Sequence, residues 1–268
     1  MRLPKFAQAT LVRRIGWLVL LKWAAFPVAP AVALLGTKGF AWLAVALGCV
    51  LLRTAVYQWE QSLRRQFVRE APMPRYLGAK LRAQYPQLSQ RDTELVLRGL
   101  RQFFMAHLRS KNAFVAMPSQ VADAAWHEFI LHTRAYEQWC KYAFGRLLHH
   151  TPAEVLGRDP KRNDGLRRSW FWACKEESIN PRAPSRLPLL FALDAKFAIP
   201  GGFSYVPDCK AIDKQAGADT YCGTSFGEGG GSGCGGDGAS GDGFSFGGSD
   251  SDGGSDGGGC GGGCGGGD

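Results

Sequence analysis

The sequence predicts a mainly α-helical protein: a transmembrane helical hairpin, then a compact helical domain with a little extended structure, then a disordered tail. Three observations predict this class. Long apolar runs lie within residues 15–57, leucine and phenylalanine recur every three or four residues between residues 97 and 108, and residues 223–268 are dominated by Gly, Ser, Asp and Cys. Such a tail cannot bury a core, so the compact domain is confined to residues 60–222.

Residues 1–59 are predicted to be a membrane anchor. The run at residues 15–35 is long enough, as a helix, to cross a hydrocarbon core of about 30 Å. A turn at residues 36–38 leads to a second apolar run at about residues 39–57. We expect two membrane helices here, with a single span or a buried soluble hairpin as the alternatives.

Basic residues flank the anchor on both sides, and the connecting turn offers only Lys38. Because Lys and Arg concentrate on the cytoplasmic side of membrane proteins, both termini and the main domain are predicted to be cytoplasmic. The expected location is the inner, cytoplasmic membrane of a bacterium, with membrane lipid as a partner. The flanking residues are Arg2, Lys5, Arg13 and Arg14 before the first run, and Arg53, Arg64, Arg65 and Arg69 after the second.

The start of the domain at residues 60–222 is expected to be helical. A polar helix leaves the anchor and ends at residues 71–74, where two prolines break it, and a short helix follows at residues 75–84. Ser89 is placed to cap the clearest helix of the chain. One face of that helix carries Leu97, Leu100, Phe104 and Leu108.

Two further helices are predicted between Ser119 and Gly145, joined as a hairpin or a bent pair. The first runs to about Leu131, and Thr133 can cap the second. Glycine commonly ends a helix because it adopts the left-handed backbone conformation, so Gly145 marks the end of the second. Downstream, residues 168–177 predict an amphipathic helix, and residues 203–206 predict a short extended run after a turn.

The net charge of +9 is unevenly distributed. Residues 223–268 hold seven acidic residues and no Lys or Arg, so the charge of the remaining chain is seven units higher, at +16. A basic body beside an anchor is typical of contact with anionic lipid. No nucleic acid is expected as a partner, because no RNP, zinc-finger or helix-turn-helix motif is present. The flexible tail is expected to contact a protein partner.

Eight cysteines are scattered through the anchor, the domain and the tail, and none forms a CxxC pair. This spacing disfavours a zinc knuckle or a thioredoxin-type site. Reduced thiols are the prediction for this chain.

Residues 117–152 hold four of the five histidines and contain the candidate functional residues of the chain. Asp123 and His127 are four residues apart on a predicted helix, so their side chains share a face. The carboxylate could orient the imidazole, or both could bind one divalent metal such as zinc. His149 or His150, after the next helix, could supply a further ligand. The candidate metal ligands are therefore Asp123, His127, His149 and His150.

A plainer interpretation stays open. Asp123 and His127 would then only stabilise their helix, and His149 and His150 would end the next one, where the helix dipole favours a cation. A Cys/His nucleophilic pair is weaker, because nothing in the sequence places Cys140 where its pKa would fall. No catalytic residue is predicted, and whether the protein is an enzyme stays open.

The motif Asp123-x-x-Trp126-His127 is followed by a set of residues with characteristic spacing: Tyr136, Cys140, Gly145, His149, His150 and Pro152. This pattern resembles the glycine-rich domain-containing-protein-like family, in its bacterial, membrane-anchored type with a Gly/Cys-rich tail. The resemblance covers residues 75–209 and the composition of the tail. It implies a shared fold and a shared site, and it names no reaction.

The sequence therefore supports two candidate functions. The first is a membrane-anchored scaffold or interaction module that presents a cytoplasmic helical domain and a flexible acidic tail. The second is a metal-binding protein or metal-dependent enzyme centred on Asp123 and His127, with His149 or His150.

Overall fold

The structure is a computed structural model of the chain, and it describes residues 5–24, 41–150, 160–207 and 220–227. The chain divides into two units, at residues 1–229 and 230–268, and the second lies outside the described residues. Of the predicted disordered tail, residues 228–268 lie outside the described residues, whereas residues 224–227 form a short helix, against the prediction. The predicted division into domains at residues 59 and 222 stays a prediction.

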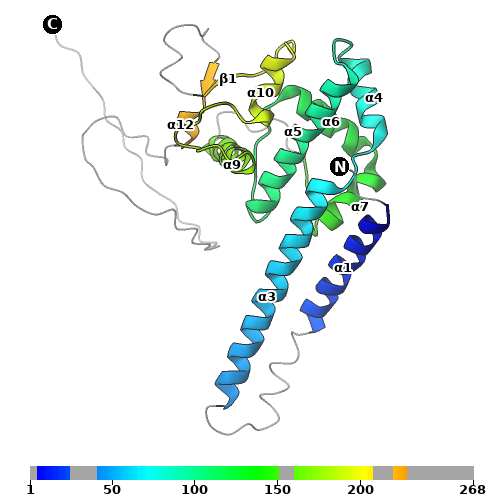
Figure 1. Cartoon of the computed structure of the whole chain (residues 1–268), viewed down its shortest axis with the longest axis vertical. Coiled ribbons are helices and arrows are strands. Elements are labelled where there is room, and N and C mark those ends of the chain that lie inside the picture. Colours follow the sequence, from blue (N-terminus) through cyan, green and yellow to red (C-terminus); the bar gives the residue numbers. More distant parts are fainter. Residues whose placement is uncertain (1–4, 25–40, 151–159, 208–219, 228–268) are drawn as a thin grey trace, which may run out of the picture. The chain divides into compact units, whose positions relative to one another are not determined.

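The first two described helices are α1 (Lys5–Ala24) and α3 (Ala41–Glu70), which lie beside one another (Figure 1). The contact buries Leu11, Ile15 and Leu18 of α1, which recur at helical spacing on one face. In α3, Val56 and Leu63 are buried in the same core. As predicted, α3 continues as one helix from the apolar run into the basic stretch.

The predicted pair of membrane spans is not found in the described part of the chain. No helix there is both long enough and apolar enough to cross a membrane. The physical reason is visible in where the helices begin: α1 starts at Lys5 and contains Arg13 and Arg14, ahead of the expected start at residue 15. Residues 25–40, which hold the rest of the first predicted span and the turn, lie outside the described residues.

The remainder of the described chain is mainly helical, as predicted. Its helices are α4 (Arg75–Gln84), α5 (Gln90–Arg109), α6 (Gln120–Leu131), α7 (Thr133–Phe144), α9 (Pro160–Glu176), α10 (Leu189–Lys196) and α12 (Thr224–Gly227). Short strands β1 (Ser204–Val206) and β2 (Thr220–Cys222) pair in parallel, with Tyr205 opposite Tyr221. The extended run at residues 203–206 is thus confirmed, whereas α10, β2 and α12 had no counterpart in the prediction.

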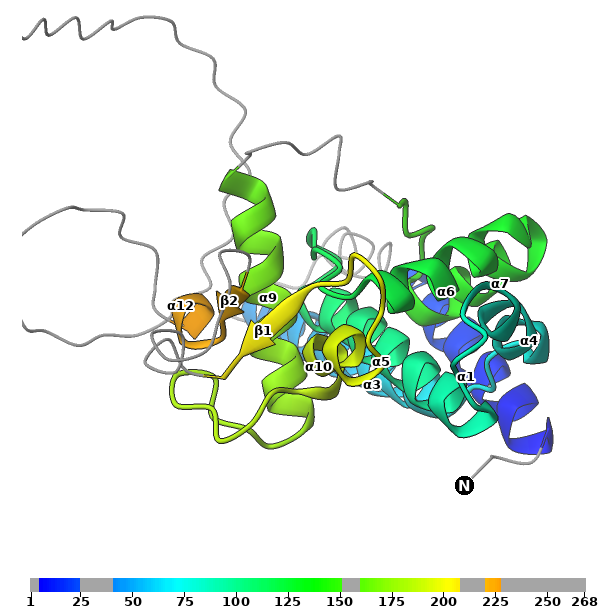
Figure 2. The same cartoon turned by 90° about the horizontal axis from the view of Figure 1, so that it is seen from above.

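The helix α5 lies at the centre of this body. Seen from above, it lies between α6 on one side and α9 on the other, and both contact it (Figure 2). Ser89 accepts a hydrogen bond from the Asp92 backbone N–H, and the Asp92 carboxylate accepts one from the Ser89 N–H, which completes a capping box. Leu100, Phe104 and Leu108 of the predicted apolar face are buried.

Among the described cysteines, the structure departs from the predicted reduced thiols at Cys222. Cys49, Cys140 and Cys174 are free, as expected. Cys222 is disulfide-bonded, so the expectation of reduced thiols is wrong there.

His107 of α5 is a buried, neutral histidine. Its Nδ1–H donates to the Ala113 carbonyl at 3.1 Å, while Nε2 finds no partner among the described residues. Burial lowers the pKa of His107 to about 4, against 6.5 for a free histidine. The unfolded chain therefore binds this proton more tightly than the folded one, so stability is complete above about pH 6.5 and falls as the pH drops towards 4.

We expect the His107→Asn variant to lose less stability on acidification than the wild type, by about 3 kcal/mol between pH 7 and pH 4. The asparagine amide can still donate to Ala113 but does not titrate. Urea unfolding at each pH measures the difference. The matched control is His149→Asn, at an exposed histidine. Parallel pH profiles for His107→Asn and the wild type would contradict the assignment.

Candidate metal centre

Two of the predicted ligands lie on one face of α6. Ser119 caps this helix by accepting a hydrogen bond from the Ala122 N–H, so Asp123 falls in the first turn and His127 one turn later. Trp126, which is adjacent to His127 in the sequence, is buried in the core and only 4% exposed. The site therefore forms at the border between the core and the solvent.

The start of α6 is held by a buried carboxylate from α10. Asp194 accepts hydrogen bonds from the Ser119 hydroxyl at 2.7 Å and from the backbone N–H groups of Gln120 and Val121 at 2.7 and 3.2 Å. It also accepts one from the Phe203 N–H at 3.0 Å. The first N–H groups of a helix have no partner within the helix, so this anion fixes the end from which Asp123 projects.

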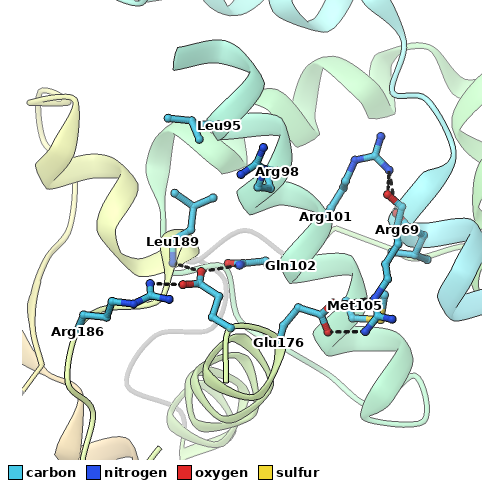
Figure 3. Close-up of a pocket in the computed structure, with 11 residues that line it drawn as sticks. Arg69, Leu95, Arg98, Arg101, Gln102, Met105, Glu176, Arg186 and Leu189 are labelled. Atoms are coloured by element: carbon cyan, nitrogen blue, oxygen red, sulfur yellow. Dashed lines mark hydrogen bonds and ion pairs between the residues drawn. The ribbon is translucent and has the colours of Figure 1, made fainter. Parts of the chain in front are cut away.

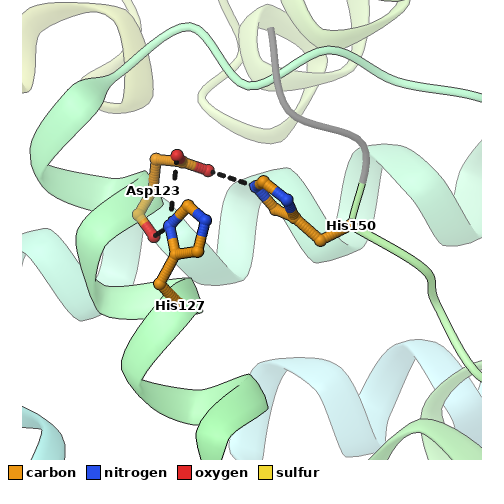
Figure 4. A group of neighbouring side chains, drawn as sticks. All are labelled: Asp123, His127 and His150. Carbon is orange, nitrogen blue, oxygen red and sulfur yellow. Dashed lines mark hydrogen bonds and ion pairs between the residues drawn. The ribbon is translucent and has the colours of Figure 1, made fainter. Parts of the chain in front are cut away.

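Asp123 lies between two histidines, and each carboxylate oxygen faces one imidazole (Figure 4). Oδ1 is 3.0 Å from His150 Nε2, and Oδ2 is 3.3 Å from His127 Nδ1. The same His127 nitrogen lies 3.0 Å from the backbone carbonyl of Asp123, which is its hydrogen-bond partner. The two imidazole centroids are 4.2 Å apart. One ligand atom from each of the three residues can be chosen so that all lie within 4.8 Å of one another.

His150 reaches the group on an extended segment that follows α7. Gly145 ends α7 in the left-handed conformation, with φ of +81°, as the sequence predicted. The Tyr136 hydroxyl then donates to the Leu148 carbonyl at 2.6 Å and accepts from Trp126 Nε1 at 3.0 Å. The His150 ring meets Trp126 edge to face, with centroids 4.6 Å apart. These contacts turn His150 towards Asp123.

The structure thus brings together Asp123, His127 and His150 of the four predicted ligands. His149 is exposed and takes no part in the group. His132 lies against Tyr76, with stacked rings 3.8 Å apart. Cys140 is buried, and burial raises the pKa of its thiol, so it stays protonated and is a poor nucleophile.

The three donor atoms suit a metal ion of intermediate softness, such as zinc. Two imidazole nitrogens and one carboxylate oxygen are typical zinc ligands, and three protein ligands leave a fourth tetrahedral position open. The side chains of His127, Asp123 and His150 are 51%, 29% and 14% exposed, so His127 is the member of the group that is most accessible to solvent. The same atoms can also form a carboxylate bridge between two imidazoles.

Fold and site together define a mainly α-helical protein with a surface Asp–His–His group. The chain belongs to the UCP032817-like family, whose model matches residues 63–226. The glycine-rich domain name expected from the motif is not supported. No curated protein and no solved structure matches the chain. The family match contains all three members of the group and begins within α3, after the end of the predicted anchor at residue 59.

Tyr136 is the structural residue that sequence reasoning did not assign. The sequence analysis noted Tyr136 only as one residue of the motif. A tyrosine on the buried face of a helix usually has a hydroxyl that needs a hydrogen-bond partner, and this is the signal that could have identified it. Burial raises its pKa, so the hydroxyl stays protonated and can donate to the Leu148 carbonyl.

We expect Tyr136→Phe to lower the free energy of unfolding by about 2 kcal/mol, because it leaves the buried Trp126 N–H and the Leu148 carbonyl without a partner. Urea unfolding followed by tryptophan fluorescence measures this change. Tyr142→Phe on the same helix is the control, since no hydrogen bond of its hydroxyl occurs among the described residues. A loss no larger than that of the control would exclude the anchoring role.

Proposed function

We propose that Asp123, His127 and His150 bind one divalent cation, with zinc as the best match to the donors. One observation carries the proposal: a single carboxylate directs one oxygen to each of two imidazole nitrogens, at 3.0 and 3.3 Å. Zinc bonds to such atoms are about 2.0–2.2 Å long. A cation between the three side chains therefore requires rotation of the exposed His127, whose Nδ1 lies 3.0 Å from the Asp123 backbone carbonyl.

The arrangement of the donors also supports a cation. Two imidazole rings 4.2 Å apart share one carboxylate, and neutral imidazole is a common ligand of divalent metal ions. With its fourth position open, the centre fits a metal-dependent enzyme or a metal-binding protein.

We expect the purified full-length protein to hold one more equivalent of zinc than His127→Ala and His150→Ala, because each substitution removes one of three ligands. Loss of a ligand should weaken binding by at least about 100-fold, more than the usual effect of a residue that only supports a ligand. Elemental analysis after dialysis measures the content, and the difference cancels zinc bound elsewhere on the chain.

His149→Ala is the matched control for this experiment, since it removes a neighbouring, exposed histidine. It should keep the zinc content of the wild type. Equal zinc content in His127→Ala and His149→Ala would refute the proposed centre.

A second candidate function is supported by the surface of α1 and α3. Several large apolar side chains there are well exposed: Trp17 (68%), Leu47 (60%), Leu51 (59%) and Trp59 (59%). Exposed apolar surface of this extent marks an interaction site. The same helices carry Arg13, Arg14 and Arg53, a combination typical of contact with anionic lipid.

We propose that lipid covers this surface and holds the helical domain at the cytoplasmic membrane as a scaffold. The acidic glycine-rich tail would then contact protein partners. Nucleic acid is not proposed as a partner.

We expect the full-length protein to sediment with vesicles of phosphatidylcholine and phosphatidylglycerol. The double variant Leu47→Glu/Leu51→Glu should bind at least tenfold more weakly, since burying one leucine contributes about 1.5–3 kcal/mol. The control, Leu131→Glu/Leu147→Glu, changes two exposed leucines of the helical domain and should bind like the wild type. Indistinguishable binding of the two double variants would overturn the lipid contact.

A further inference from the structure

A separate cavity lies between α3, α5, α9 and the start of α10 (Figure 3). Its volume is about 540 Å³, within the range of about 300–1,000 Å³ that is usual for small-molecule sites. It shares no residue with the Asp123, His127 and His150 group. Four of its lining residues are arginines: Arg69, Arg98, Arg101 and Arg186.

Both carboxylates of the cavity already have cationic partners. Glu176 pairs with Arg69 at 2.8 Å and with Arg109 at 2.9 Å. Glu177 pairs with Arg186, and it also accepts hydrogen bonds from the Gln102 amide and the Leu189 N–H. The negative charges of Glu176 and Glu177 are therefore already balanced by these partners, and neither carboxylate forms an ion pair with Arg98 or Arg101.

Arg98 and Arg101 lie three residues apart on α5, and neither pairs with an acidic residue in the described ranges. Arg101 uses one nitrogen, Nη1, to donate to the carbonyls of Val68 and Arg69 at 2.9 and 3.1 Å. A guanidinium has five N–H donors, so others stay available. Arg98 is exposed, and its side chain makes no hydrogen bond to another residue that the structure describes.

Burial makes the charge of Arg101 costly. Loss of hydration lowers the pKa of Arg101 to about 10, so the guanidinium stays charged near neutral pH although it has lost much of its water. A bound anion would compensate this loss, and charge-assisted bonds from planar guanidinium groups are among the strongest contacts to carboxylate and phosphate.

Apart from these charged residues and Gln102, the lining is apolar. Val68, Leu95, Met105 and Leu189 contribute side chains to the same cavity. A bare inorganic ion would leave this surface uncovered, whereas a ligand with a short hydrocarbon portion would bury it.

We propose that this cavity binds a small organic anion, with a phosphate or carboxylate head between Arg98 and Arg101 and a short apolar body against Leu95 and Leu189. The site is independent of the proposed cation centre, so each can fail without the other. The expected ligand of this cavity is an oxyanion joined to a hydrocarbon group of a few carbon atoms.

The experiment is calorimetric titration of the full-length protein with n-butyl phosphate, inorganic phosphate and n-butanol. Butyl phosphate should bind with a Kd on the order of 1 mM or lower. Inorganic phosphate should bind at least about fivefold more weakly, because it covers none of the apolar wall. Butanol should give no saturable binding. Absence of saturable butyl phosphate binding, or equal affinity for inorganic phosphate, would overturn the proposal.

The diagnostic variant is Arg98→Gln, because this side chain is exposed and its loss breaks no hydrogen bond among the described residues. It should weaken butyl phosphate binding about tenfold, the effect of losing one charge-assisted contact. Arg91→Gln removes the same charge from an exposed position on α5 outside the cavity, and it should bind like the wild type. Equal weakening in both variants would show only a general charge effect and reject the site.

Discussion

Burial of α5 is the constraint on which the rest of the helical body depends. Phe103 and Phe104 are at most 1% exposed, and their rings meet Trp126 and Trp139 at centroid distances of 4.9 and 4.7 Å. Full burial of one large apolar side chain contributes about 1.5–3 kcal/mol. These ring contacts therefore fix α6 and α7 against α5. Because Trp126 and His127 are neighbours on α6, the packing of the first determines that the second faces the solvent.

Buried polar side chains then fix the ends of the helices that carry the Asp–His–His group. Asp194 caps the start of α6. Arg64 of α3, paired with Glu60, donates to the Lys141 and Tyr142 carbonyls near the end of α7. The last carbonyls of a helix lack partners within it, so this guanidinium holds α7 to α3. Each contact joins segments more than 70 residues apart, and the group therefore depends on the whole domain.

Much of the helical body could be predicted from local signals, because prolines, capping residues and a glycine mark where helices begin and end. The pairing of Asp123 with His127 follows from their spacing alone. The choice between His149 and His150 does not, because neighbours on an extended segment point to opposite sides. Contacts between distant residues decide which ring turns inward: Tyr136 binds the Leu148 carbonyl, and Trp126 packs against His150. The helix α10 was also missed, since eight mostly apolar residues contain no clear period.

The position of the group at the edge of the core bears on what a cation would do there. A structural zinc site is closed by four protein ligands and supplies folding energy. Here the core behind the group is complete without an ion, because Trp126 is buried and its N–H is bonded to Tyr136. His127, in contrast, is half exposed. An ion bound by Asp123, His127 and His150 would therefore contribute little to holding the helices together. Its open position would instead remain accessible to a water molecule or a substrate atom, which is the arrangement that ligand exchange requires.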